Sequence, residues 1–534
     1  MVKAIAKDKR KPFIGIANTW NEISLSNCHL KDIAQAVKEG ILAGGGIPFE
    51  FQTIAVSDGY TFNHEGMKYV LASRELIADS IEMAARAYGF DGLVFIAGGD
   101  KPIPAAMMAM LRLDLPGIMI NGGYSQPEKR GAGGFSTMDL LRGIEDYRTS
   151  IVMEDYIRET EEAALTGAGD GSGMYTPNSM ACLAEALGLA LPYTSTFSAS
   201  SFKKLQSSYQ AGEQICRLVK QGLSPRKIVT PQAMENAIRV GMTIGISTNS
   251  VLHLLAIAAE ARIPLTLADF HVPGTECPLL CPITPSGPYT LHDLHLAGGI
   301  PAVMKRIQDQ LHLHEMTVSG ETLGDSISTA EVYDETVIRP LSLPVHPHGS
   351  IRIIYGNLAP QGAVTRPLNI APHLWKHQGT ARVFSEEKEA IEAIYNGKIE
   401  RGNIIVLSYQ GPKGGPGMQE VYGITSAITR VGLRNSTILL TDGRFSGAYF
   451  CACIGHICPE AADQGPLAIV KDGDTIAVDI PNRSIDLLAS PEEMAKRLQA
   501  LPPFIPKGGK GYLKRYVQQV GPACEGATLR PFLR

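Results

Sequence analysis

Short apolar segments alternate with helix-period segments along the first two thirds of the chain, and this alternation constrains the fold more than any other feature. Residues 12–17, 53–56, 92–97 and 118–120 have the length and apolar character of buried strands. Residues 68–88 are predicted to form a helix, as is a segment whose apolar residues share one face, Leu30, Ile33, Val37 and Ile41. The alternation predicts a three-layer α/β domain with a largely parallel sheet.

After about residue 345 the pattern changes to strands separated by glycine turns. The pair Asp472-Gly473 is typical of a hairpin turn, and the expected strands are residues 350–355, 404–409, 437–440 and 467–480. This half is predicted to be a compact β-rich barrel or sandwich.

A chain of 534 residues is expected to form two or three domains. The stretch 339–349 is rich in proline and histidine and is the expected boundary. The predicted domains are therefore residues 1–345, the α/β part, and residues 346–534, the β-rich part.

Composition narrows the class of protein. Hydrophobic residues make up 44% and charged residues 19%, which is typical of a soluble globular protein, and a net charge of −4 favours neither nucleic acid nor an anionic membrane as a partner. The longest apolar stretch, residues 251–258, is far too short to cross a membrane. Nine scattered cysteines, an odd number, favour reduced thiols and a cytoplasmic location.

Glycine-rich polar turns follow several of the predicted strands. Asp58 lies in Ser57-Asp58-Gly59, and Asp100 follows Gly98-Gly99. Ligands of parallel sheets usually bind beyond the carboxyl ends of the strands, so both aspartates are candidate site residues. Taken alone, each is equally typical of a helix cap or a turn.

Several long strings, in the same order along nearly the whole chain, carry a family resemblance. They are TIAVSDG at 53–59, HEGMKY at 64–69, STN at 247–249, YGNLAP at 355–360, GPKGGPGM at 411–418 and TDGRFSG at 441–447. With these strings the chain resembles the dihydroxy-acid and 6-phosphogluconate dehydratase family, and within it the branched-chain dihydroxy-acid branch most.

The resemblance implies a larger α/β domain, a C-terminal β-barrel domain, and an active site between them in a homodimer or a dimer of such dimers. It also implies removal of water from a small 2,3-dihydroxy acid, giving an enol that becomes a 2-oxo acid. In the family, magnesium holds the carboxylate and the 2-hydroxyl, an iron–sulfur cluster takes the 3-hydroxyl, and a serine removes the C2 proton.

Carried over by position, the magnesium ligands are Asp58, Asp100, Lys101 and Glu420. Oxygen donors suit Mg²⁺, and Lys101 would join them by carboxylation of its amine. The alternative for Lys101 is an ion pair with Asp100 or a solvated position. Ser446 corresponds to the family's base, and its alternative role is a turn or cap hydroxyl.

The three positions that hold cluster cysteines in the family are Ser26, Gly99 and Gly171 here. Clusters need thiolates, which neither serine nor glycine supplies, so we expect no iron–sulfur cluster. Asp170 is either a general acid for the leaving hydroxyl or a filler of the space that the cluster vacated. A second group, Cys451, Cys453 and Cys458, either binds a metal or packs as small apolar residues.

Three functional hypotheses follow. The first is a cluster-free, magnesium-dependent lyase that acts on a small hydroxy acid, with Ser446 and Asp170 as catalytic residues. The second keeps only proton abstraction, and so catalyses enolisation, isomerisation or elimination of a leaving group other than hydroxide. The third is a non-catalytic binding or assembly protein on the dehydratase scaffold.

Overall fold

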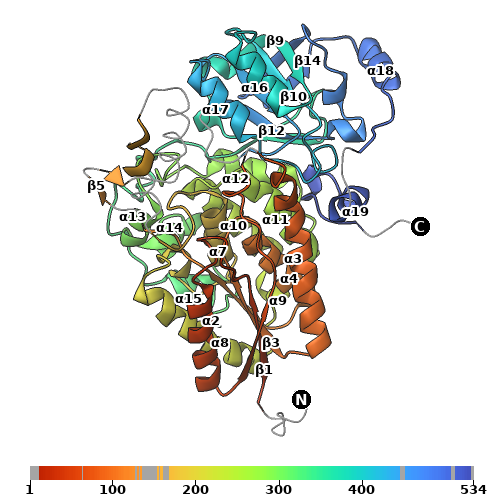
Figure 1. Cartoon of the computed structure of the whole chain (residues 1–534). Coiled ribbons are helices and arrows are strands. Elements are labelled where there is room, and N and C mark those ends of the chain that lie inside the picture. The colour runs from red at the N-terminus through yellow and green to blue at the C-terminus, as the bar shows by residue number, and fades with distance from the viewer. Residues whose placement is uncertain are drawn as a thin grey trace.

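The computed structural model describes residues 11–62, 64–126, 129–130, 133–134, 153–155, 157–159, 167–445, 451–506 and 511–530 (Figure 1). Two parts of the chain are stacked on each other. The N-terminal part is built around a parallel sheet, and the C-terminal part forms a larger mixed sheet above it, as Figure 1 shows.

The N-terminal sheet is parallel throughout, in the order β2-β1-β3-β4. Its strands are β1 (Phe13–Asn18), β2 (Ile47–Gln52), β3 (Gly92–Ala97) and β4 (Gly117–Asn121). Helices α2 (Leu30–Ala43) and α8 (Phe202–Gln221) pack on one face, while α3 (Met67–Tyr88) and α4 (Pro102–Leu113) pack on the other. The predicted three-layer α/β arrangement is confirmed.

Further helices extend this part beyond the sheet. They are α7 (Thr176–Ala186), α9 (Pro225–Ile228), α10 (Pro231–Ile244), α11 (Asn249–Ala261), α12 (His271–Glu276), α13 (Leu291–Leu296), α14 (Gly299–Arg306) and α15 (Leu323–Ile327). The short strands β5 (Lys129–Arg130) and β6 (Gly133–Gly134) pair with each other. None of the helices in the described ranges is long and apolar enough to cross a membrane.

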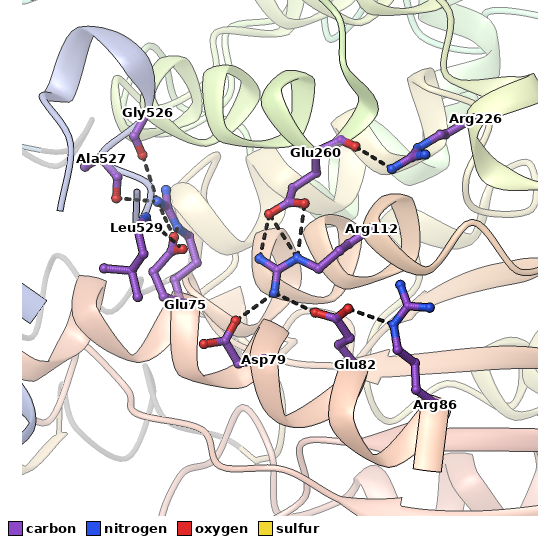
Figure 2. Close-up of polar contacts among 11 residues, drawn as sticks. Glu75, Asp79, Glu82, Arg86, Arg112, Arg226, Glu260, Gly526, Ala527 and Leu529 are labelled. Carbon is purple, nitrogen blue, oxygen red and sulfur yellow. Dashed lines mark hydrogen bonds and ion pairs between the residues drawn. The ribbon is translucent and has the colours of Figure 1, made fainter. Parts of the chain in front are cut away.

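Charged side chains join three of these helices. Arg112 of α4 donates to Asp79 of α3 at 2.6 Å and to Glu260 of α11 at 2.6 Å (Figure 2). Glu82, one turn further along α3, accepts from both Arg112 and Arg86. A shared guanidinium therefore holds α3, α4 and α11 together.

The C-terminal sheet has eight strands in the order β14-β13-β9-β10-β11-β12-β8-β7. Its strands are β7 (Arg352–Ile354), β8 (Gly362–Thr365), β9 (Lys376–Phe384), β10 (Ile404–Leu407), β11 (Ile438–Thr441), β12 (Ala452–Cys458), β13 (Thr475–Asp479) and β14 (Ser484–Leu487). The central strands β9 to β12 are parallel and the outer ones antiparallel. The sheet is strongly curved and nearly closed, so the predicted barrel-like half is confirmed.

Four helices accompany this sheet: α16 (Glu387–Tyr395), α17 (Tyr422–Arg430), α18 (Pro491–Gln499) and α19 (Tyr512–Gln519). Helix α19 returns to the N-terminal part, where Tyr512 Oη donates to the carbonyl of Ala72 on α3 at 2.9 Å. The end of the chain therefore connects the two parts.

Two local predictions are wrong. Residues 53–56 are not a strand, because β2 ends at Gln52 opposite the last residue of β1 and has no neighbour to pair with beyond it. Asp472-Gly473 does not join two paired strands, since a 3-10 turn at Pro466–Ile469 precedes it and β13 follows. Asp472 instead accepts from the backbone N–H of Val383 on β9 at 2.9 Å.

Helices α2 and α8 touch backbone to backbone through two glycines. A Cβ at Gly40 would lie 1.9 Å from the carbonyl oxygen of Tyr209, and one at Gly212 would lie 2.3 Å from that of Val37. Because backbone cannot retreat as a side-chain end can, this contact accepts no larger residue.

We expect Gly40→Val to force these helices apart and lower the free energy of unfolding by about 1–3 kcal/mol or more. Denaturant unfolding followed by circular dichroism measures it. Leu42→Ala on the same helix, at a side chain 61% exposed, is the matched control and should change stability by less than about 0.5 kcal/mol. An unchanged midpoint for Gly40→Val would contradict the packing described.

Candidate metal centre

Three carboxylates from distant parts of the chain meet where the two parts of the fold touch. Asp58 lies in the turn that follows β2, Asp100 follows β3, and Glu420 precedes α17. One carboxylate oxygen from each lies within 4.8 Å of the other two. Asp100 and Glu420 are buried and Asp58 is half-buried. Strands β2 and β3, which lie on either side of β1, end at the same edge of the sheet, so the loops that follow them bring Asp58 and Asp100 together, and the C-terminal half supplies Glu420.

Two buried cations accompany the carboxylates. Lys101, with no exposed side-chain surface, donates to Asp100 Oδ2. Arg444, equally buried, donates to Glu420 Oε2 at 3.2 Å and to the carbonyl of Met418 at 2.7 Å. These pairs offset part of the like-charge repulsion among the three acids. The unmodified Lys101 ammonium is therefore placed as an ion-pair partner of Asp100.

The donor set fits a hard divalent cation. Within the described part of the chain, Asp100 Oδ1 and Glu420 Oε1 are buried and have no hydrogen-bond partner. Unpaired buried carboxylate oxygens are costly unless a cation completes them. Loss of water, together with the negative charges of Asp100 and Glu420, raises the pKa of Asp58 well above its usual value. An Mg²⁺ ion bound among the carboxylates would pair with both free oxygens and would lower the raised pKa of Asp58.

Two neutral histidines, His253 and His456, lie near Lys101 and Arg444. Neither was predicted from the sequence as a site residue. Burial, followed by the charge of Lys101, lowers the pKa of His253 well below its usual value. Burial and the charge of Arg444 lower the pKa of His456 to about 3. His253 Nδ1 accepts from Arg74 Nη1 at 3.2 Å, so its proton is on Nε2. Arg444 lies inside the string TDGRFSG at 441–447, which carried the resemblance, and this string was the available signal for it.

Ser26, Gly99 and Gly171, the positions that the resemblance assigns to cluster cysteines, lie around Asp170. Asp170 is 3% exposed, its Oδ2 accepts from the backbone N–H of Gly99 at 3.4 Å, and its carboxyl group also has a hydrogen bond with the Ser26 side chain. A Cβ at Gly98 would lie 2.1 Å from the carbonyl oxygen of Ser26, so the segments are in close contact. Burial raises the pKa of Asp170 to about 7, and Asp100 adds to the rise.

The three C-terminal cysteines do not gather around one point. Cys451 Sγ and Cys453 Sγ are 3.4 Å apart, whereas Cys458 Sγ contacts Cys524 Sγ. Among the described residues, the only group of three or more His, Cys, Asp or Glu side chains that could hold a metal ion is Asp58, Asp100 and Glu420. This arrangement favours Cys451 and Cys453 as buried core residues.

A cavity of about 900 Å³, lined by residues of both parts of the fold, reaches the carboxylate group at Glu420. Glu420 forms part of its wall, together with His64, Lys68, Tyr409 and Gln410. The His64 side chain forms a hydrogen bond within its own turn, where its Nε2 lies 2.9 Å from the carbonyl oxygen of Tyr60. A small acid entering this cavity would therefore meet the metal centre. Ser446, the predicted base, lies outside the described residues.

Comparison with known proteins agrees with this geometry. A profile of the dihydroxy-acid/6-phosphogluconate dehydratase N-terminal domain matches residues 11–326, and that of the C-terminal domain matches residues 336–527. The chain belongs to this family.

Similar curated proteins are named dihydroxy-acid dehydratase. The one from Methanoregula boonei is 46% identical over 97% of this chain and 94% of its own length. The proteins from Caldicellulosiruptor bescii and Acetivibrio thermocellus are each 45% identical, over 97% and 98% of this chain and 95% of their own lengths. The similarity therefore includes both parts of the fold.

We expect Mg²⁺ to stabilise the protein, by about 2.7 kcal/mol at 100 times its dissociation constant. Asp58→Asn should weaken Mg²⁺ binding at least about tenfold and stabilise the metal-free protein, because it removes one of three crowded charges. Thermal unfolding with and without Mg²⁺, and calorimetric titration, measure both effects.

The pH dependence has a defined sign. Mg²⁺ affinity should fall as the pH falls through the raised pKa of Asp58, because protons then compete for its carboxylate. Metal-free protein should lose stability as the pH rises through the same pKa. Glu65→Gln removes an exposed carboxylate from the wall of the same cavity and should leave the Mg²⁺ response intact. An equal loss in both variants would contradict the assigned ligands.

Proposed function

We propose that this protein is a magnesium-dependent hydro-lyase that removes water from a small 2,3-dihydroxy acid without an iron–sulfur cluster. The activity follows from family membership and from the names of relatives that match almost the full chain. The observation that carries the magnesium part is the convergence of Asp58, Asp100 and Glu420 within 4.8 Å.

In this proposal Asp58, Asp100, Glu420 and a carboxylated Lys101 hold the ion. Bound Mg²⁺ would supply a Lewis acid for the substrate's carboxylate and 2-hydroxyl. Burial and the charge of Arg444 lower the pKa of Lys101, which favours the neutral amine that carboxylation requires. Arg444 orients Glu420 through the 3.2 Å ion pair. The resemblance assigns removal of the C2 proton to Ser446.

The residues at the cluster positions do not fit an iron–sulfur cluster. Ser26, Gly99 and Gly171 offer no thiolate. The nearest cysteine in sequence, Cys28, has its thiol directed to the carbonyl oxygen of Leu25 at 3.6 Å. No step of the proposed reaction passes through a cluster.

Asp170 would replace the missing activation of the leaving group. Hydroxide is a very poor leaving group, so the 3-hydroxyl must be protonated as its bond to carbon breaks. A carboxyl with a pKa of about 7 is substantially protonated at neutral pH and can donate from its Oδ atoms. Its position beside Gly99, one residue before the ligand Asp100, supports this role over mere filling of space.

Asp170→Asn should lower kcat by about 100- to 10,000-fold, because the amide keeps the shape but supplies no proton. In the unaltered enzyme, activity should fall as the pH rises above about 7, where Asp170 loses its proton. Steady-state kinetics with a branched 2,3-dihydroxy acid between pH 5.5 and about 9 tests both points.

Two controls separate this role from a structural one. Glu185→Gln alters another buried carboxyl whose pKa burial raises to about 7, but its partners are Ser195 and Tyr193. The Glu185→Gln enzyme should show the same dependence of activity on pH as the unaltered enzyme. A 3-halo analogue needs no protonation of its leaving group, so Asp170→Asn should lose far less activity on it. An equal loss on both substrates would contradict the acid role and favour space filling.

Anaerobic purification followed by metal analysis and an absorption spectrum tests the cluster-free part of the proposal. We expect magnesium without stoichiometric iron or sulfide and without a brown chromophore. Iron and sulfide at cluster stoichiometry would refute it. Activity on the 3-halo analogue alone would instead support the second hypothesis, elimination of a leaving group other than hydroxide.

The assembly implied by the resemblance is also part of this proposal. A homodimer is expected, and sedimentation velocity of the full chain measures its mass. Binding of the hydroxy acid without turnover, in protein loaded with Mg²⁺, would favour the non-catalytic hypothesis.

A further inference from the structure

Two cysteines far apart in the sequence touch at the boundary between the two parts of the fold. Cys458, at the end of β12, and Cys524 have their sulfur atoms 2.7 Å apart. Both thiols also approach one acceptor, Gln361 Oε1, at 3.3 and 3.4 Å. A disulfide has its sulfurs about 2.05 Å apart, so an approach of less than about 1 Å would join them.

The two thiols differ in their surroundings. Cys524 is partly exposed, whereas Cys458 is 1% exposed. The hydrogen bond that Cys458 donates lowers the pKa of Cys524, and the same contact with burial raises that of Cys458. Thiol exchange begins with an accessible thiolate, so Cys524 has the properties of the attacking sulfur and Cys458 those of the resolving one.

Cys524 belongs to a segment that touches both parts of the molecule. We call residues 520–530 the C-terminal segment. Arg74 Nη2 on α3 donates to its carbonyls at Gly526 and Ala527, at 2.7 and 2.9 Å (Figure 2). A Cβ at Gly526 would lie 2.5 Å from the backbone nitrogen of Ala256 on α11. The segment is therefore packed on the N-terminal helices, while its cysteine faces β12.

We propose that Cys458 and Cys524 form a reversible disulfide that fastens the C-terminal segment to strand β12. The bond would tie β12 covalently to a segment that is packed on α3 and α11 of the N-terminal part by hydrogen bonds and close contact. The inference rests on the described contacts alone and does not depend on the reaction proposed above.

The oxidant we name is a low-molecular-weight disulfide. The Cys524 thiolate attacks one of its sulfurs, its S–S bond breaks, and one thiolate leaves, giving a mixed disulfide on Cys524. That thiolate takes the proton of Cys458, whose sulfur then attacks Cys524 and releases the second thiolate, which takes from solvent the proton that Cys524 lost when it ionised. Overall, two protein thiols are oxidised and one disulfide is reduced to two thiols. An excess of dithiol reverses both exchanges.

Equilibration of the full-length protein in glutathione buffers of increasing oxidised fraction tests the proposal. After alkylation, intact mass and peptide mapping should reveal the loss of two of the nine alkylatable thiols and a peptide cross-linking residues 458 and 524. Dithiothreitol should restore all thiols. The oxidised form should also unfold at a higher temperature than the reduced form.

Single variants identify the role of each sulfur. Cys458→Ser should trap one glutathione on Cys524, whereas Cys524→Ser should leave Cys458 unmodified. Cys28→Ser is the matched control, since Cys28 is also partly exposed but its thiol meets only a backbone carbonyl, and it should retain the cross-link. Full alkylation of both cysteines in the most oxidising buffer, or a glutathione adduct on Cys524 of the unaltered protein that never resolves, would overturn the proposal.

Discussion

Three carboxylates meet where the two parts of the fold touch, and the repulsion among them is the main electrostatic constraint on the structure. Asp58, Asp100 and Glu420 place carboxylate oxygens within 4.8 Å of one another, in surroundings with little water. The negative charges of the three carboxylates repel one another unless cations lie beside them. The buried Lys101 and Arg444 meet part of this need. Among the described residues, Asp100 Oδ1 and Glu420 Oε1 have no hydrogen-bond partner, so a divalent ion bound to them would meet the rest.

The charges also explain why the two parts of the fold belong together. The acids come from both sides, two from the parallel sheet and one from the C-terminal half, so neither half has a complete site alone. Asp170 extends the same electrostatic system, because the charge of Asp100 helps to raise its pKa. In our proposal, one region thus holds the metal and, beside it, a proton for the leaving group.

The C-terminal segment, residues 520–530, also connects the two parts of the fold near the carboxylate group. Arg74 joins its carbonyls to His253, whose low pKa reflects burial and, after it, the charge of Lys101. The contact of Cys458 with Cys524 joins the same segment to β12, the strand that carries His456. The packing of a few residues near the end of the chain is therefore linked to the histidines beside the metal centre.

The α/β class, the barrel-like second half and the family could be predicted from the sequence, because periodicity and long motif strings are local properties of the chain. It also placed Asp100 just after a strand, whereas the strand expected at residues 53–56, before Asp58, did not form and β2 ends at Gln52. Only the tertiary structure decided which side chains meet: Glu420 with Arg444, Asp170 with Ser26 and Gly99, and Cys458 with Cys524 rather than Cys451 or Cys453. These contacts join residues 24 to 144 positions apart, and such long-range packing, with the burial that shifts pKa values, is not encoded in any local pattern.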